Sequence, residues 1–317
     1  MLSALLRIFG ILLMLTALAV PLVRAPDRAP ESLVARWAPR PSVLVEVGGM
    51  AVHLRDEGPR NDPAPLLMLH GLGSSLHTWE PWAAALRGQR RVIRFDLPGA
   101  GLTGPWAGSY PANDYRSEAL ARFTLDLMDA LKLRRVVLVG HSLGGEVAWQ
   151  LASRQPDRVE RLVLLDATGL AIAPLEVPPG LRLARVPVFG WLGQHLLPRG
   201  AVSATLESVY ADPRRITPEL VDRHFELLLR EGNRKALRQA LMQQQPGRDV
   251  ERLDGLRLPT LLLWGEKDRV VPPAAGAEFA RRIPGAQFQV LSGLGHAPQE
   301  EAPERSLGAL QAFLPPR

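Results

Sequence analysis

Apolar residues follow two alternating patterns along most of the chain. Short, nearly continuous apolar runs are typical of strands buried on both faces, and Gly48-Gly49 between two such runs indicates a β-hairpin. Residues 116–131 instead repeat apolar side chains at helical spacing, as in Leu120, Phe123 and Leu127. We expect strands at 43–47, 50–55, 66–69, 91–95, 136–139, 161–165, 260–263 and 288–291, and a further helix at 146–154. The alternation predicts an α/β fold with a mostly parallel sheet between two layers of helices.

One long segment interrupts this alternation. Residues 170–245 contain no convincing strand; they begin rich in proline and continue with helical patterns such as 218–230. We therefore expect a helical cap at about 170–245, inserted between two core strands of a single globular domain that covers 42–317.

The first 25 residues differ from the rest of the chain. Residues 8–23 form an uninterrupted apolar run, whereas a membrane-spanning helix needs about 20 apolar residues and a signal-peptide core roughly 7–15. We expect residues 1–25 to form an uncleaved membrane anchor; a cleaved signal segment and a buried helix of the domain are the alternatives. Residues 26–41 are rich in proline and arginine, which predicts an irregular tether.

An anchor of this kind would associate the protein with a membrane, in bacteria the inner membrane. A cleaved segment would make the domain periplasmic or secreted. The charges beside the run conflict on orientation, because Arg7 precedes it while Arg24, Arg28, Arg36 and Arg40 follow it. The side of the membrane and the oligomeric state therefore stay open.

The composition excludes several kinds of reactive site and partner. The chain of 317 residues has no cysteine, which excludes disulfides, thiolate nucleophiles and thiolate metal sites. Its formal net charge is +6, but the arginines are spread along the chain and no basic run reaches five residues. A nucleic-acid-binding surface needs basic residues gathered on one face, so we expect no nucleic-acid partner.

One motif combines a sharp turn with a reactive side chain. Gly140-His141-Ser142-Leu143-Gly144 matches G-x-S-x-G, directly after one predicted strand and before a predicted helix. Such a turn leaves room only for glycines beside the central residue and forces the serine into an exposed position. Ser142 is therefore the candidate nucleophile.

A serine hydroxyl needs a base and an acid that orients the base. His296 follows the last predicted strand, after Ser142 in the sequence, and is the candidate base. Asp268 follows the preceding strand and is the favoured acid. Asp166, at the end of the strand after the nucleophile helix, is the alternative, and Glu266 is a weaker one.

The remaining site residues follow from the geometry that acyl transfer requires. Backbone N–H groups must face the developing oxyanion, and Leu143 together with Leu72 in the loop His70-Gly71-Leu72-Gly73 are the expected donors. We expect Asp96, followed by Pro98 and Gly99, to brace a loop. Substrate contacts are expected from His141 and from the cap residues Phe189, Trp191 and His195.

These motifs together make the chain resemble the α/β-hydrolase family, within its lidded branch of esterases and meta-cleavage-product hydrolases. The resemblance is carried by the segments HGLGSS at 70–75, FDLPGAGLT at 95–103, VLVGHSLGGEVA at 137–148, LLLWGEKDRVVP at 261–272 and GLGHAPQEEAPE at 293–304. It implies an eight-stranded sheet with a helical cap over the active site, and no cofactor or metal.

The resemblance also separates reaction types. Ser142 disfavours the branches with an aspartate nucleophile, and Ala297 after His296 disfavours C–C hydrolases, which usually carry tryptophan there. We expect a serine hydrolase, a carboxylesterase that cleaves a small carboxylic ester or related acyl substrate. The alternatives are a C–C hydrolase of meta-cleavage-product type, a cofactor-free perhydrolase or haloperoxidase, and a catalytically silent, membrane-tethered interaction protein.

Overall fold

The computed structural model describes residues 24–186 and 195–315, together with residues 7, 9–11, 14 and 193. Its centre is one eight-stranded sheet with the strand order β1-β2-β4-β3-β5-β6-β7-β8. β2 pairs antiparallel with both β1 and β4, and all the other neighbouring pairs are parallel. The predicted fold class, a mostly parallel eight-stranded sheet, is confirmed.

Each expected strand is present, with ends shifted by three residues at most. The strands are β1 Val43–Val47, β2 Met50–Glu57, β3 Leu66–Leu69, β4 Val92–Phe95, β5 Val136–His141, β6 Val159–Leu165, β7 Thr260–Gly265 and β8 Gln287–Leu291. The central strands β3, β4, β5 and β7 are buried along their whole length. Their continuous apolar runs reflect this burial, because successive side chains point to opposite faces and both faces are covered.

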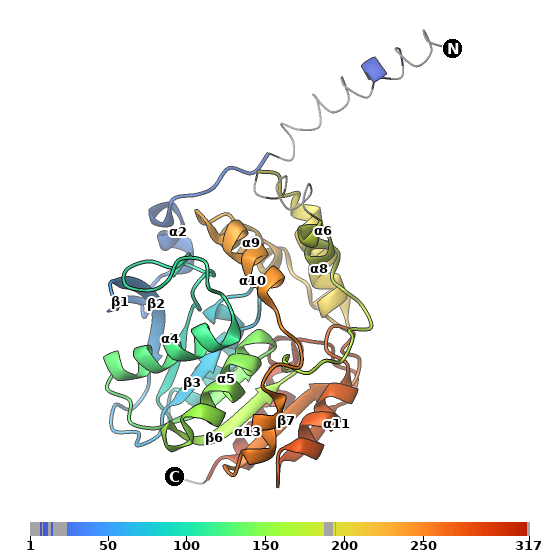
Figure 1. The fold of residues 1–317 in the computed structure, drawn as a ribbon. Helices are drawn as coiled ribbons and strands as arrows, with labels where there is room; N and C mark the ends of the chain where they lie inside the picture. Colours follow the sequence, from blue (N-terminus) through green and yellow to red (C-terminus); the bar gives the residue numbers. More distant parts are fainter. Residues whose placement is uncertain are drawn as a thin grey trace.

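Helices cover both faces of the sheet (Figure 1). In sequence order, these helices are α3 Glu80–Leu86, α4 Ser117–Ala130, α5 Leu143–Arg154, α11 Pro273–Arg282, α12 Pro298–Glu301 and α13 Pro303–Phe313. The chain also forms short 3₁₀ turns at Leu76–Trp79, Pro156–Arg158, Pro213–Arg215 and Val250–Gly255. α4, α5 and α11 pack with Leu138 and Leu164 on one face. α3 and α13 pack with Val137 and Val163 on the other.

The helix after the nucleophile begins earlier than predicted. It starts at Leu143, not at residue 146, and so includes Gly144 and Gly145. Glycine disfavours helices by about 1 kcal/mol each relative to alanine, which hid the true start. Packing outweighs that cost here, because a Cβ atom on Gly145 would lie 2.6 Å from Cβ of Ala167.

Four described helices lie between β6 and β7, together at the top of the molecule in Figure 1. They are α6 Pro179–Arg185, α8 Arg199–Val209, α9 Pro218–Leu228 and α10 Asn233–Gln243. α9 begins with a standard N-cap, because Thr217 Oγ1 accepts a hydrogen bond from the Leu220 N–H at 3.1 Å and Pro218 occupies the first turn. We refer to these four helices as the cap.

The prediction of an irregular tether at 26–41 is wrong for part of that segment. Residues Pro30–Trp37 form the helix α2, which starts at a proline and buries Leu33 and Trp37. α2 packs on α9, and the Trp37 indole N–H donates to Glu226 Oε2 at 2.7 Å. Arg36 also pairs with Glu226. The helix is stable because the cap, which is distant in the sequence, packs against its apolar face and pairs with its charged side chains.

The predicted anchor falls mostly outside the described residues. Of the apolar run 8–23, the structure describes residues 9–11 and 14, which are helical. Phe9, Ile11 and Met14 are exposed. Within the described part of the chain, no helix combines the length and the apolar character that crossing a membrane requires.

Candidate active site

Ser142 stands at the turn from β5 into α5. Its φ and ψ angles are 54° and −120°, a positive φ that non-glycine residues rarely adopt and that functional sites often hold. The turn is tight, since a Cβ atom on Gly144 would lie 2.4 Å from the Leu69 carbonyl oxygen. A Cβ atom on Gly140 would lie 2.2 Å from the Gly144 carbonyl oxygen. The glycines of the motif are therefore required by the backbone around the serine.

The structure brings Ser142, His296 and Asp268 into one hydrogen-bonded chain. The Ser142 hydroxyl lies 3.0 Å from His296 Nε2, and His296 Nδ1 lies 2.7 Å from Asp268 Oδ2. All three residues are buried. A neutral imidazole that donates from Nδ1 to a carboxylate presents Nε2 as the acceptor for the serine proton.

Asp268 is held by its own loop. Its Oδ1 accepts hydrogen bonds from the N–H groups of Val270 at 2.8 Å and Val271 at 2.9 Å. With the His296 contact on Oδ2, three N–H donors face this carboxylate. These hydrogen bonds fix the position of the carboxylate beside the imidazole.

Asp166, the alternative acid, lies next to Asp268 in the structure. One oxygen of each carboxyl and one ring nitrogen of His296 all lie within 4.8 Å of one another. Asp166 Oδ1 accepts from the Gly265 N–H at 2.8 Å. Burial, and then the neighbouring charge of Asp268, raise the pKa of Asp166 well above its usual range. These three groups are close enough to ligate one metal ion, but His296 Nδ1 and Asp268 Oδ2 are already hydrogen-bonded to each other.

Glu266, the weaker alternative for the acid, contacts the loop after β8 and not the imidazole of His296. Its Oε2 accepts from the Ser292 hydroxyl at 2.8 Å and from the Gly293 N–H at 2.7 Å. It therefore fastens the loop that carries His296 instead of contacting the imidazole.

Two backbone N–H groups beside Ser142 are available for an oxyanion. Leu143 occupies the first position of α5, where N–H groups have no partner within the helix. Among the described residues, no acceptor is hydrogen-bonded to the N–H of Leu143 or of Leu72. The loop of Leu72 is close to the serine, since a Cβ atom on Gly71 would lie 3.0 Å from Ser142 Cβ.

Neighbouring polar residues brace this loop and the one after β4. His70 Nε2 accepts from the Leu97 N–H at 3.0 Å, and Asp96 accepts from the N–H groups of Leu76 and Leu102. Burial raises the pKa of Asp96, but the adjacent His53, 2.7 Å away, outweighs it and holds that pKa well below the usual range. Asp96 therefore braces a loop, as expected from the sequence, and His70 braces the same region through Leu97.

His141, an expected substrate contact, faces the cavity on one side and contacts His296 on the other. It lines the cavity above Ser142, and its Nε2–H donates to the His296 carbonyl oxygen at 2.6 Å. Its ring also packs at 4.9 Å from the His296 ring. Burial, and then the His296 charge, lower the pKa of His141 to about 3. A neutral His141 therefore helps to hold the candidate base.

A cavity of about 700 Å³ opens over Ser142 between the sheet and the cap. Its walls are mainly apolar; those from the cap include Leu181, Val202, Leu206, Leu237 and Leu241. Phe189 and Trp191 lie outside the described residues. His195 is described, but it does not line this cavity.

One pair of residues at the site was not predicted. Arg223 of α9 donates to Glu300 Oε2 at 2.6 Å, and each side chain is only 13% exposed. Glu300 lies four residues after His296 and lines the cavity. The pair joins the cap to the segment that carries the candidate base. No local sequence pattern marks it, because its partners are 77 residues apart.

A family model and several known proteins are similar to this chain. The family model of the alpha/beta hydrolase fold matches residues 64–303. A 2-hydroxymuconate semialdehyde hydrolase of Pseudomonas putida is 30% identical over 278 residues, which are 84% of this chain and 91% of that protein. Another relative is the dihydrolipoyllysine-residue acetyltransferase component of the acetoin cleaving system of P. putida. It is 32% identical over 273 residues, which are 85% of this chain and 68% of that protein.

Among solved structures, the enol-lactonase from Burkholderia xenovorans LB400 superposes with a TM-score of 0.70 at 27% identity, over 86% of this chain and 99% of that one. The family match covers most of the chain, and the hydrolases similar to it extend over nearly the same region. This chain is therefore a hydrolase that belongs to the α/β-hydrolase family.

Proposed function

We propose that the protein is a serine hydrolase that cleaves a carboxylic ester through an acyl-enzyme. The observation that carries the proposal is the chain of hydrogen bonds from Asp268 through His296 to Ser142, beside two N–H groups that have no acceptor among the described residues. A strained serine, a neutral imidazole and free N–H donors at one point are what acyl transfer requires.

The proposed steps follow from this geometry. His296 Nε2 takes the Ser142 proton as Oγ attacks the ester carbonyl, and the N–H groups of Leu72 and Leu143 stabilise the oxyanion. His296 then passes the proton to the leaving alkoxide, which departs as the alcohol. Water, activated in the same way, adds to the acyl-enzyme and releases the carboxylic acid and Ser142. Asp268 stabilises the imidazolium in both halves of the reaction.

A fluorophosphonate probe tests the nucleophile. We expect the full chain to be labelled covalently and the Ser142→Ala variant not to be labelled. Labelling of Ser142→Ala equal to that of the wild type would remove Ser142 from the mechanism. A series of p-nitrophenyl esters of increasing acyl length, compared with a dienoic C–C substrate, then separates ester from carbon–carbon cleavage.

Carbon–carbon hydrolysis is the second candidate, and a specific observation favours it. One relative is named as a 2-hydroxymuconate semialdehyde hydrolase, and another, from P. putida F1 and 29% identical over 86% of this chain, as a 2-hydroxy-6-oxo-2,4-heptadienoate hydrolase. Against it stands Ala297, whose small side chain offers no aromatic contact after His296. We therefore place ester cleavage first.

We further propose that residues 1–25 attach the protein to a membrane, in bacteria the inner membrane. The support is the apolar run 8–23 and the exposure of its described members Phe9, Ile11 and Met14. Fractionation of the expressed full chain tests this: we expect it in the membrane fraction after high-salt washing. Recovery of the uncleaved chain in the soluble fraction would contradict the attachment.

A further inference from the structure

Apolar side chains are exposed on one side of the cap. Leu175 is 73% exposed just before α6, Leu183 within α6 is 51% exposed, and Val186 at its end is 42% exposed. Arg182 and Arg185 stand between them, and neither has an ion pair among the described residues. We call Leu175, Arg182, Leu183, Arg185 and Val186 the rim face. Scattered apolar residues are common on protein surfaces, so their exposure alone does not indicate a binding surface. The location of the rim face is the evidence that matters.

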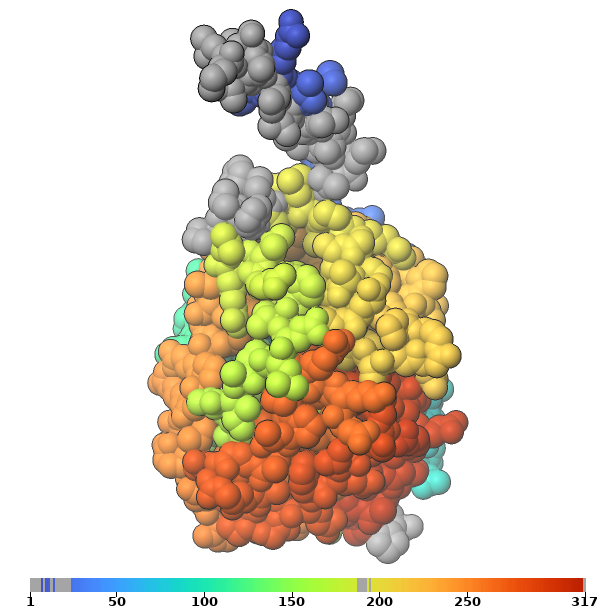
Figure 2. Space-filling model, turned by 90° about the vertical axis from the view of Figure 1, so that its right-hand side faces the viewer, coloured from blue at the N-terminus to red at the C-terminus, as the bar shows by residue number. Residues whose placement is uncertain are grey.

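The rim face borders the cavity over Ser142. Leu181 and Ala184 of α6 line the cavity, and Leu183 both lines it and is exposed, which places Leu183 at its edge. In Figure 2, α6 and the yellow-green chain before it lie on the surface beside yellow α8. The preceding segment is fixed to the loop of Asp268, because Glu176 pairs with Arg269 at 2.9 Å.

Arg24 and Ala25, which follow the N-terminal apolar run in the sequence, contact the chain beside the cavity. The Ala25 N–H donates to the His195 carbonyl at 3.0 Å, and Arg24 forms an antiparallel bridge with Leu196. Leu196 and Leu197 line the cavity. The segment that follows the run 8–23 is therefore held next to residues that line the cavity.

We infer that the rim face is a lipid-contacting surface, through which an amphiphilic long-chain ester passes from a bilayer into the cavity. An apolar patch that includes arginines matches the interface of a bilayer containing anionic lipids, where apolar side chains enter the acyl boundary and cations meet the headgroups. The apolar cavity of about 700 Å³ then receives the acyl chain and presents its ester to Ser142. This substrate class rests on the proposed esterase function.

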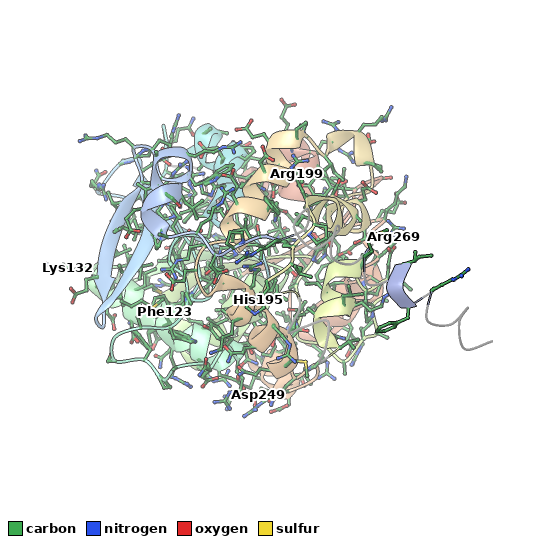
Figure 3. All side chains as sticks on the ribbon, turned by 90° about the horizontal axis from the view of Figure 1, so that it is seen from above. Phe123, Lys132, His195, Arg199, Asp249 and Arg269 are labelled. Carbon is green, nitrogen blue, oxygen red and sulfur yellow. The ribbon has the colours of Figure 1, made fainter. Side chains whose placement is uncertain are left out.

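The chain offers a direct test, because it contains no cysteine. A single Leu183→Cys substitution in the full chain, labelled with an environment-sensitive NBD fluorophore, reports on the rim face alone. Leu44→Cys is the matched control: Leu44 is 61% exposed on β1, and Figure 3 shows the β1–β2 hairpin across the molecule from Arg269. The probe vesicles are phosphatidylcholine and phosphatidylglycerol in a 4:1 ratio.

On transfer of the full chain from detergent into these vesicles, the label at 183 should shift to the blue and gain intensity at least about twofold more than the label at 44. Equal responses at the two positions would overturn the inference. A response at 183 that depends on protein concentration and needs no vesicles would assign the rim face to a second copy of the chain, and would overturn it as well.

Hydrolysis gives the second readout. The double variant Leu175→Ser, Val186→Ser, at two positions that do not line the cavity, should lose tenfold or more in its rate on p-nitrophenyl palmitate in vesicles, with an unchanged rate on soluble p-nitrophenyl butyrate. The control Val43→Ser, Leu44→Ser should keep both rates. Equal rates of the double variant and the wild type on both esters would contradict the inference alone, whereas no activity of the wild type on either ester would contradict the proposed esterase.

Discussion

The carboxyl groups of Asp166 and Asp268 lie side by side in the protein interior, at the ends of the neighbouring strands β6 and β7. Both residues are at most 1% exposed. Two buried carboxyls this close cannot both be ionised at low cost, so one keeps its proton. Backbone N–H groups and His296 stabilise the charge of Asp268, whereas burial and Asp268 raise the pKa of Asp166. Asp166 is therefore the neutral member.

The first prediction separates the two acids. Asp268→Asn should lower kcat on a p-nitrophenyl ester by about 10³-fold or more, because an amide cannot stabilise the imidazolium. Asp166→Asn should cost less than about tenfold, because its amide can still accept from the Gly265 N–H and donate towards Asp268. Steady-state kinetics of the two variants measures both. A larger loss of kcat at position 166 would make Asp166 the acid of the triad.

The second prediction concerns stability against pH. The pKa of Asp166 is raised in the folded chain, so its stabilising contribution is complete below the unfolded value of about 3.9 and is lost as the pH rises through the folded value. The unfolding free energy of the wild type should therefore fall relative to Asp166→Asn as the pH rises above about 4, by at most about 1.4 kcal/mol per pH unit. Urea titrations from pH 5 to 9 measure this difference.

The control for that comparison is Asp157→Asn, at an exposed position. Its unfolding free energy should follow the wild type across the same range. Curves for the wild type and Asp166→Asn that stay parallel would show that Asp166 titrates alike in the folded and unfolded chain.

The third prediction tests how His296 is positioned. His141→Phe keeps an aromatic ring against His296 but removes the N–H that donates to the His296 carbonyl, so kcat should fall about tenfold. Because the pKa of His141 is about 3, this residue stays neutral between pH 5 and 9. The rising limb of the pH profile of kcat should therefore remain at the wild-type pH. A limb that moves with this substitution would mean that His141 titrates in the reaction.

The sequence could predict whatever depends on local pattern and chain order. Strands such as Val136–His141 are recognisable because burial on both faces leaves a continuous apolar run. Ser142 and His296 follow from a motif and from their order along the chain. The fold class and the hydrolase assignment derived from these features are confirmed.

Features that depend on distant contacts could not be predicted. The sequence favoured Asp268 over Asp166 but could not show that the two carboxyl groups lie next to each other, because Asp166 follows β6 and Asp268 follows β7 about 100 residues later. The helix α2 lies in a segment rich in proline and arginine, and its partner Glu226 is 189 residues away from Trp37. In each case the deciding partner comes from another part of the fold.

The fourth prediction concerns Arg223 and Glu300, which join the cap to the segment of His296. Arg223→Met would leave the Glu300 carboxylate largely buried without its cation, so the unfolding free energy at pH 7 should fall by about 3 kcal/mol. Arg223→Met combined with Glu300→Leu removes both charges and should recover most of that loss, less the hydrogen bond that the Thr78 hydroxyl donates to Glu300. Urea unfolding of both single variants and the double variant yields the coupling energy. A double variant as unstable as the sum of its single variants would show that the pair contributes nothing specific to holding the cap on the His296 segment.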